Sequence, residues 1–388
     1  MRHPRGGGRL VLGLTLLMAA CGDGTGPASG VPMPVTLVAA AGDYTCAVDL
    51  TRHGWCWGAG LTGQLGNGDT TIYRTPQPMA LSLEFQSISS GEFHSCGLTL
   101  EDAAWCWGTN FIGVLGIGRL SGREPVPLPV AGGIRFRSIS AGNAHTCGLD
   151  RAGAAWCWGQ GEDGRLGVGD TLDRLEPVPV ETTLRFTQLS AGGAHSCAID
   201  RNAEAWCWGA NFRGQLGAGD TVESALPRLV GGGHRFRSIE TGNYFSCGLL
   251  ESGAAWCWGD NLISELGNGE LTVAPVVLPV AVAGGRHFVA LSLGREHACA
   301  RTAAGEAWCW GSSIYGKLGH DDFLPTPVPV AVAGGLTFTS VAAAGNHTCA
   351  VTTAGALYCW GRNNVGQFGD STRSDALQPT PVLPFPVP

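Results

Sequence analysis

Two cysteines stand ten residues apart in seven successive segments of the chain, and this spacing limits the possible folds more than any other feature. In six segments the second cysteine lies in a Trp-Cys-Trp triplet, and in the seventh it lies in Tyr-Cys-Trp. Neighbouring pairs are about 50 residues apart, so the sequence is a tandem repeat. The pairs are Cys46 and Cys56, Cys96 and Cys106, Cys147 and Cys157, Cys197 and Cys207, Cys247 and Cys257, Cys299 and Cys309, and Cys349 and Cys359.

Each repeat contains four short segments with the pattern of a β-strand. In the third repeat, residues 136–140 alternate apolar and polar side chains, and residues 145–150 and 155–158 follow after short turns. Residues 176–180 are rich in proline, which cannot donate to a strand ladder, so this segment belongs at a sheet edge. Four strands in each of seven repeats predict an all-β fold, a seven-bladed β-propeller of four-stranded blades.

The two ends of the repeat region complete the set of strands. Residues 35–39 supply the first strand of the first repeat, and residues 378–383 supply the last strand of the seventh. The propeller therefore extends over residues 35–385. The strand patterns leave open which strand lines the central channel.

The spacing of ten predicts a disulfide bond across a hairpin in each blade. If residues 151–153 form a three-residue loop, Cys147 faces Cys157 in a non-hydrogen-bonded pair, whose Cα atoms are about 4.5 Å apart. Disulfides accept this separation, and each bridge would contribute at most about 3 kcal/mol to stability. Glycine suits the last position of such a loop, so we expect different turns where Arg52 and Ala203 occupy it.

A metal site is the alternative use of paired cysteines. Zinc ligands usually come in pairs about two to four residues apart, and the sequence has no Cys-x-x-Cys. A nearby histidine such as His145 would add only a third ligand. The hairpin geometry favours disulfides, and we expect no metal and no cofactor. The two indoles of each triplet share the strand face opposite the cysteine, and we expect them to pack in the core rather than to bind a ligand.

The N-terminal residues differ from the repeats. Three arginines precede an apolar stretch that is too short to cross a bilayer, which predicts a signal peptide over residues 1–20. The small residues before Cys21 resemble the lipobox of bacterial lipoproteins, and the resemblance implies cleavage before Cys21 and a lipid on its thiol. Simple secretion is the alternative. Residues 21–34 are rich in Gly, Pro and Ser and predict a flexible tether.

The predicted export places the chain in the bacterial cell envelope, periplasmic or surface-facing, where disulfides persist. The formal net charge is −7, and removal of the three N-terminal arginines makes it −10. An acidic chain without basic patches excludes a nucleic-acid partner. We expect the protein to be a monomer that contacts the membrane only through the lipid on Cys21.

Several motifs recur in the same order along the repeats. They are His-Ser/Thr-Cys, then Trp-Cys-Trp-Gly, then a loop motif such as Gly-Gln-Leu-Gly-Asn-Gly-Asp at residues 63–69 and Gly-Gln-Leu-Gly-Ala-Gly-Asp at residues 214–220. Over about residues 35–385 this order resembles the repeat of the regulator of chromosome condensation family. The resemblance implies a seven-bladed propeller. It does not fix the function, because the founding member is a nuclear exchange factor and this chain carries an export pattern.

Two sets of equivalent polar residues are candidates for chemistry. Five histidines precede the first cysteine of a pair, and they would bind a metal or sense pH if they formed a ring; we expect each to hydrogen-bond to a neighbouring turn instead. Four acidic residues follow Gly-x-Gly and would hold calcium, but the loops lack the ligand density of an EF-hand, so we expect them to form turns. These residues are His94, His145, His195, His297 and His347, and Asp69, Asp170, Asp220 and Glu270.

The residues that vary most between repeats follow Trp-Gly. Apolar residues and arginine on the loops of a rigid ring suit a protein-binding face, and ordinary packing between blades is the alternative. We predict that partner binding uses Phe111, Ile112, Phe212, Arg213, Leu262, Ile263, Ile314 and Tyr315.

The sequence contains no nucleophile elbow, P-loop or His-Glu-x-x-His motif, and no repeat breaks the shared pattern strongly. We therefore expect no enzyme and no catalytic residue. The sequence favours an exported, membrane-anchored module that binds an unknown protein or another envelope component. The alternatives are an extracytoplasmic enzyme or an enzyme inhibitor that uses one end of the ring, and a structural or adhesion module.

Overall fold

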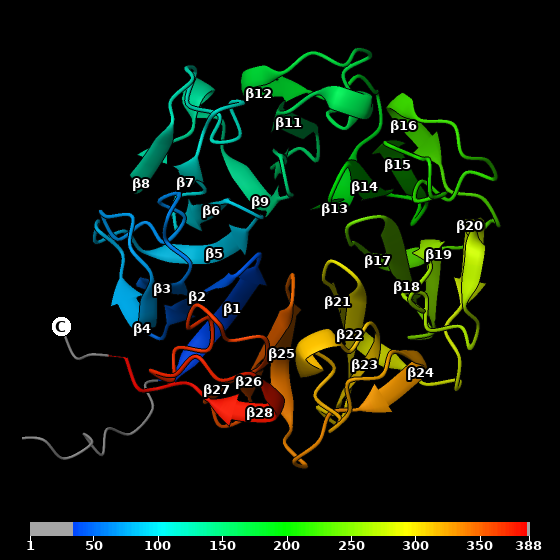
Figure 1. The fold of residues 1–388 in the computed structure, drawn as a ribbon. Helices are drawn as coiled ribbons and strands as arrows, with labels where there is room; N and C mark the ends of the chain where they lie inside the picture. Colours follow the sequence, from blue (N-terminus) through cyan, green and yellow to red (C-terminus); the bar gives the residue numbers. More distant parts are fainter. Residues whose placement is uncertain (1–33, 386–388) are drawn as a thin grey trace, which may run out of the picture. The chain divides into compact units, whose positions relative to one another are not determined.

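Every repeat folds into one antiparallel four-stranded sheet, and the seven sheets stand around a common axis (Figure 1). The computed structural model describes residues 34–385. Within each sheet the strand order follows the chain, so one continuous stretch of sequence forms one blade. This confirms the predicted seven-bladed propeller. The predicted signal peptide over residues 1–20, the lipidation of Cys21 and the tether up to residue 33 lie outside the described residues.

The first strand of each blade lies innermost, so the first strands line the channel (Figure 1). Six of them begin with a phenylalanine that packs on the second tryptophan of its own blade, as Phe136 does on Trp158. The first blade has Val35 instead, and Phe385 from the end of the chain packs on Trp57 there. The first strands are β1 (Val35–Ala41), β5 (Phe85–Ser90), β9 (Phe136–Ala141), β13 (Phe186–Ala191), β17 (Phe236–Thr241), β21 (Phe288–Leu293) and β25 (Phe338–Ala343).

The second and third strands form the hairpin that carries the cysteines. The predicted register is present, with Cys147 opposite Cys157, and the corresponding residues pair in every blade. These strands are β2 (Tyr44–Asp49), β3 (Gly54–Gly58), β6 (His94–Thr99), β7 (Ala104–Thr109), β10 (His145–Asp150), β11 (Ala155–Gly159), β14 (His195–Asp200), β15 (Ala205–Gly209), β18 (Phe245–Leu250), β19 (Ala255–Asn261), β22 (His297–Thr302), β23 (Ala307–Gly311), β26 (His347–Thr352) and β27 (Leu357–Gly361).

The proline-rich fourth strand lies at the outer edge of each blade, as predicted. The last of these strands begins two residues earlier than the sequence pattern indicated, at Ala376 rather than at residue 378. Three short 3-10 helices complete the fold: η1 (Ala131–Gly133), η2 (Glu162–Gly164) and η3 (Ile314–Gly316). The fourth strands are β4 (Tyr73–Pro78), β8 (Arg123–Pro129), β12 (Arg174–Pro179), β16 (Ser224–Leu229), β20 (Thr272–Ala281), β24 (Thr326–Ala331) and β28 (Ala376–Pro381).

All seven predicted disulfides are present, and the Cα atoms of each pair lie 4.1 Å apart. Six of the seven bridges share a buried cluster with aromatic residues of the next blade, and the bridge between Cys299 and Cys309 packs with Leu318 and Ala343. The bridge between Cys96 and Cys106, for example, lies in one buried cluster with Phe136 and Trp158 of the following blade. The second tryptophan of every triplet is fully buried, whereas the first is half-buried in most blades. The interior of the ring is therefore built at the junctions between blades.

The hairpin turns are alike in all blades, so the expectation of different turns at Arg52 and Ala203 is wrong. Both residues adopt the left-handed backbone conformation, with φ of 70° and 63°, that Gly153 adopts in the third blade. The same two hydrogen bonds close the turn, as from Ala203 N to Asp200 O. The hairpin register and the bridge behind it hold this conformation against its intrinsic cost of about 1–2 kcal/mol for a residue with a side chain.

Within the described part of the chain, no helix is long and apolar enough to cross a bilayer.

Unfolding the protein without reducing it tests the bridges. We expect thiol titration to find at most the thiol of Cys21, because the other fourteen cysteines are paired. Titration after reduction provides the control for complete exposure. The recovery of several thiols before reduction would contradict the pairing.

Exchanging residues at the left-handed turn position should change stability in opposite directions. We expect Ala203→Gly to stabilise the protein by up to about 1 kcal/mol, because glycine adopts this conformation without steric cost. The reciprocal change Gly153→Ala should destabilise it, since an added Cβ would lie 2.8 Å from Phe186 O. Chemical unfolding of both variants measures the two shifts, and a loss of stability in Ala203→Gly would contradict the account of the turn.

Candidate binding face

The two sides of the ring are built from different connections. The strands of a blade run antiparallel, so the turns between first and second strands and the loops between third and fourth strands lie on one side. We call this side the loop face. The opposite side carries the hairpin turns and the links from one blade to the next. The long loops of the loop face are residues 59–72, 110–122, 160–173, 210–223, 262–271, 312–325 and 362–375.

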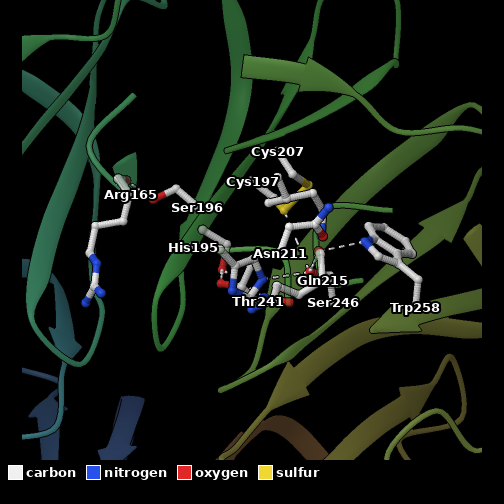
Figure 2. The surroundings of a disulfide bond; sticks show 12 residues. Arg165, His195, Ser196, Cys197, Cys207, Asn211, Gln215, Thr241, Ser246 and Trp258 are labelled. Carbon is white, nitrogen blue, oxygen red and sulfur yellow. Dashed lines mark hydrogen bonds between the residues drawn. A yellow bond between two sulfur atoms is a disulfide. The ribbon is translucent and has the colours of Figure 1, made fainter. Parts of the chain in front are cut away.

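Hydrogen bonds from the next blade fix the base of each long loop (Figure 2). Between blades four and five, Gln215 O accepts the indole N–H of Trp258 at 2.9 Å and the hydroxyl of Ser246 at 3.0 Å. The same hydroxyl lies 2.8 Å from Nε2 of His195, which precedes the disulfide in the fourth blade. These hydrogen bonds form a network from the tryptophan through the carbonyl and the hydroxyl to the histidine. The network joins two blades and fixes one loop.

The contact with the hydroxyl determines which nitrogen atom of the histidine carries the proton. The hydroxyl has one proton and donates it to the loop carbonyl, so Nε2 of the histidine must carry a proton and donate to the hydroxyl oxygen. Our expectation that the histidines bond to a neighbouring turn is therefore wrong, because their partner is a strand hydroxyl of the next blade. Five junctions share this contact at 2.8–2.9 Å: His94 with Thr146, His145 with Ser196, His195 with Ser246, His297 with Thr348, and His347 with Thr45.

Burial keeps these histidines neutral. Desolvation lowers the pKa of His94 to about 4 and the pKa of His195 to about 3. Each ring contacts its own hydroxyl rather than another ring, and residues 34–385 contain no group of His, Cys, Asp or Glu arranged to hold a metal ion. The five histidines therefore act as hydrogen-bonding groups between blades.

Two junctions depart from this pattern. At the first, Tyr44 replaces the histidine, and its hydroxyl lies 2.8 Å from Ser95. At the junction between blades five and six, Phe245 replaces the histidine and Ala298 replaces the hydroxyl residue. Both polar partners are lost together there, which avoids a buried unpaired group. The repeats aligned with one another show this paired replacement, and our sequence analysis missed it.

The predicted contact residues divide into exposed tips and packed neighbours. Phe111, Phe212 and Ile314 stand at the tips of loop-face loops and are 67%, 54% and 49% exposed. Leu61, 60% exposed, has the equivalent place in the first blade and was missed, although alignment of the repeats would have found it. Further exposed apolar residues lie on the same loops: Leu120, Leu172, Val222, Leu271, Phe323 and Leu324.

The remaining predicted residues are half-buried and bind their neighbours in the ring. The guanidinium of Arg213 lies 3.9 Å from Asp260 of the next blade. The ring of Tyr315 lies beneath the guanidinium of Arg362, also in the next blade. Packing between blades, the alternative that we considered, therefore accounts for these two residues. Ile112, Leu262 and Ile263 are half-buried as well.

Polar side chains cross the axis at the loop face. Arg295 of the sixth blade donates to Glu92 of the second at 2.8 Å, and Asn143 of the third donates to Asn243 of the fifth at 3.1 Å. The surrounding pocket of about 90 Å³ is lined mostly by glycine and alanine from all seven blades. These pairs join blades that are not neighbours at the mouth of the channel.

One acidic residue breaks the symmetry of the innermost strands. Glu240 stands where four other blades have a serine, and it is the one acid among the seven first strands. Burial raises its pKa to about 7, and its carboxyl contacts Gln188 and Ser190. Glu240 was not among the site residues predicted from the sequence. A lone carboxyl with amide and hydroxyl neighbours does not by itself assemble the unlike groups that catalysis needs.

The repeats of this chain match a known family of proteins. The chain matches the family described as "Regulator of chromosome condensation (RCC1) repeat" over residues 55–98, 101–149, 152–199, 202–249 and 304–351. A second family of the same description matches residues 136–165, 186–215, 281–317 and 338–367.

Two curated plant proteins are similar over part of their length. The ultraviolet-B receptor UVR8 of Arabidopsis thaliana is 31% identical over 168 residues, which are 40% of this chain and 38% of the receptor. The mitochondrial RCC1 domain-containing protein RUG3 of the same plant is 29% identical over 152 residues, which are 37% of this chain and 34% of that protein. The matched region is thus well under half of each relative.

Solved structures share the fold at low sequence identity. Prp20p of Saccharomyces cerevisiae superposes with a TM-score of 0.76 and 22% identity, over 90% of this chain and 87% of the yeast chain. Human WBSCR16 superposes with a TM-score of 0.76 and 19% identity, over 85% of this chain and 94% of the human chain. At this identity the likeness shows the fold alone.

The buried histidines should make stability depend on pH. Each folded-state pKa lies below the unfolded value of about 6.5, so the unfolded chain binds more protons below pH 6.5 and stability falls as the pH falls. We expect His195→Gln to reduce this fall by up to about 1.4 kcal/mol per pH unit between about pH 6.5 and pH 4. Urea unfolding across this range measures the slope. His53→Gln, at an exposed position, is the control, and equal slopes in both variants would refute the assignment.

Proposed function

Because the chain belongs to the regulator of chromosome condensation repeat family, we propose that it is a protein-binding propeller whose loop face holds another protein or envelope component. The exposed apolar tips carry this proposal. Phe111, Phe212, Ile314 and Leu61 extend from loops whose bases are hydrogen-bonded into the ring. Apolar side chains held in fixed positions lose little freedom when they bind, which favours their use as anchors.

The composition of the face supports a protein partner. Aromatic residues and arginine are enriched at protein interfaces, and exposed apolar groups gathered on one side of a soluble domain mark interaction sites. The formal net charge of −7 argues against a nucleic acid as the partner. Yeast Prp20p, which shares the fold, has been solved bound to Kap60 and studied for binding to Gsp1p and histones. Protein binding is therefore a use that this fold supports.

We further propose that the protein works outside the cytoplasm. Seven disulfides persist in an oxidising compartment and are rare in a reducing one. The proposed arrangement has a signal peptide over residues 1–20, a lipid on Cys21, a tether to residue 34 and the propeller over residues 35–385. The lipid is the membrane contact, and the tether leaves the ring free to meet a partner in the bacterial envelope.

Replacing loop tips tests the proposed face. The full chain, used as bait in an envelope extract, should capture a saturable protein partner, and the double change Phe111→Asp with Phe212→Asp should reduce capture by about tenfold or more. The matched control is Leu50→Asp with Leu100→Asp, because both leucines are exposed in hairpin turns on the opposite side. Equal capture by the loop-face variant, or loss only in the hairpin variant, would place the interface elsewhere.

A further inference from the structure

The junction between blades five and six departs from the other six in three ways. Phe245 and Ala298 stand where five other junctions have a histidine bonded to a hydroxyl. Ser264 occupies a left-handed turn position, with φ of 66°, that is glycine in the other loops. Glu265 follows it, at a position that is glutamine in three blades. Departures from a repeat that coincide at one place point to a role that the repeat itself does not have.

Phe245 and Glu265 are among the residues that line a pocket on the loop face. It has a volume of about 170 Å³, well above the roughly 10–15 Å³ that one water molecule requires by this measure. Tyr244 contributes an aromatic group, and Leu262 and Ile263 contribute aliphatic groups, whereas Phe245 also lines the pocket but is fully buried. Glu265 and two further carboxyls, Asp260 and Glu296, also line it. The pocket therefore combines apolar walls with acidic groups.

Glu265 is buried and forms no ion pair, although the buried ammonium of Lys317 is close enough to attract it electrostatically. It is 3% exposed, and one oxygen accepts the backbone N–H of Ile263 at 2.8 Å, as the glutamine amide oxygen does in the preceding blade. Replacing glutamine by glutamate at this place keeps the backbone bond and adds a negative charge. Among residues 34–385 no cationic side chain forms an ion pair with this carboxyl. A buried carboxylate without a compensating charge is unfavourable unless something binds it.

The other charged side chains that line the pocket lie close to oppositely charged groups elsewhere. Glu296 pairs with the buried ammonium of Lys317 at 3.4 Å, and Asp260 lies 3.9 Å from Arg213. Arg295 also lines the pocket, but its guanidinium binds Glu92 across the axis at 2.8 Å. Desolvation raises the pKa of Glu265 to about 7, and the negative charges of Asp260 and Glu296 add to this shift. The pocket thus has one acidic group left to satisfy.

We propose that this pocket binds a protonated amine or guanidinium group carried on a short apolar stem. The carboxylate of Glu265 would accept the cation, the ring of Tyr244 would contact it, and Leu262 and Ile263 would pack against the stem. A lysine or arginine side chain has this chemistry, and so does a small diamine. The assignment of this group to a protein partner rests on the proposed function. It extends that function by naming a basic residue of the partner as the group that enters the loop face.

Small probes test the pocket without any partner. Titration calorimetry would compare N-acetyl-lysine methylamide and N-acetyl-arginine methylamide with N-acetyl-norleucine methylamide, which has an apolar stem and no charge. We expect the wild-type protein to prefer the charged probes by about tenfold or more, and Glu265→Gln to abolish the preference. Equal binding of the norleucine probe, or an unchanged preference in Glu265→Gln, would overturn the proposal.

Two controls separate the pocket from general effects. Glu265→Gln should fold, because glutamine makes the equivalent backbone bond at Gln64, Gln215 and Gln367. Glu162→Gln changes the net charge equally at an exposed loop tip and should keep the full preference for charged probes. Affinity for the charged probes should also decrease between pH 8 and pH 6, because protonation of Glu265 removes the acceptor charge. The other charged groups that face it are Asp260, Glu296, Arg295, Lys317 and Arg213.

Cadaverine distinguishes the two sources of the cation. Tighter binding of cadaverine than of the lysine probe assigns the pocket to a free amine, and tighter binding of the lysine probe assigns it to a side chain of the partner. The capture experiment is independent of this result. If capture fails while the preference for charged probes persists, the proposed function falls and the pocket stands. If loop-face capture succeeds without that preference, the pocket assignment falls alone.

Discussion

The contact between the disulfide face of one blade and the aromatic face of the next supports the whole ring. An isolated four-stranded sheet would leave both faces in water, because each tryptophan finds its apolar surroundings partly in a neighbouring blade. The indole N–H also needs an acceptor when buried, and six of the seven second tryptophans find it in a loop carbonyl of the preceding blade. Burial of the core and placement of the loops are therefore one process, completed when the ring closes.

This coupling explains how the repeat tolerates change. The histidine of one blade depends on the hydroxyl of the next, since without it the buried Nε2 would have no partner, whereas the hydroxyl would keep its bond to the loop carbonyl. The first junction keeps the hydroxyl of Ser95 and replaces the histidine with Tyr44, whose own hydroxyl makes the contact. The junction between blades five and six loses both members at once. That replacement removes a polar link from the junction where Glu265 and the apolar pocket occur.

The loop tips are free to vary because the bases of the loops are not. Hydrogen bonds at residues such as Gln215 secure the base, whereas Phe111 and Phe212 extend beyond it and are not required for the core. A rigid ring with variable tips on one side is suited to recognition, since binding does not have to order the scaffold first. The pairs Glu92–Arg295 and Asn143–Asn243 extend this rigidity by joining blades that are not neighbours in the ring.

The sequence by itself determined the number of blades, the order of strands and the pairing of the cysteines, because these depend on local spacing: ten residues within a hairpin and about 50 between repeats. It also indicated the loops that hold Phe111, Phe212 and Ile314. Only the tertiary structure decided which tips are exposed, that Arg213 and Tyr315 pack between blades, and that Ala203 takes a left-handed turn. It also brought Glu265, Asp260 and Glu296 together from two blades. These features depend on contacts across a junction, and a pattern read within one repeat does not contain the residue that the next blade places opposite it.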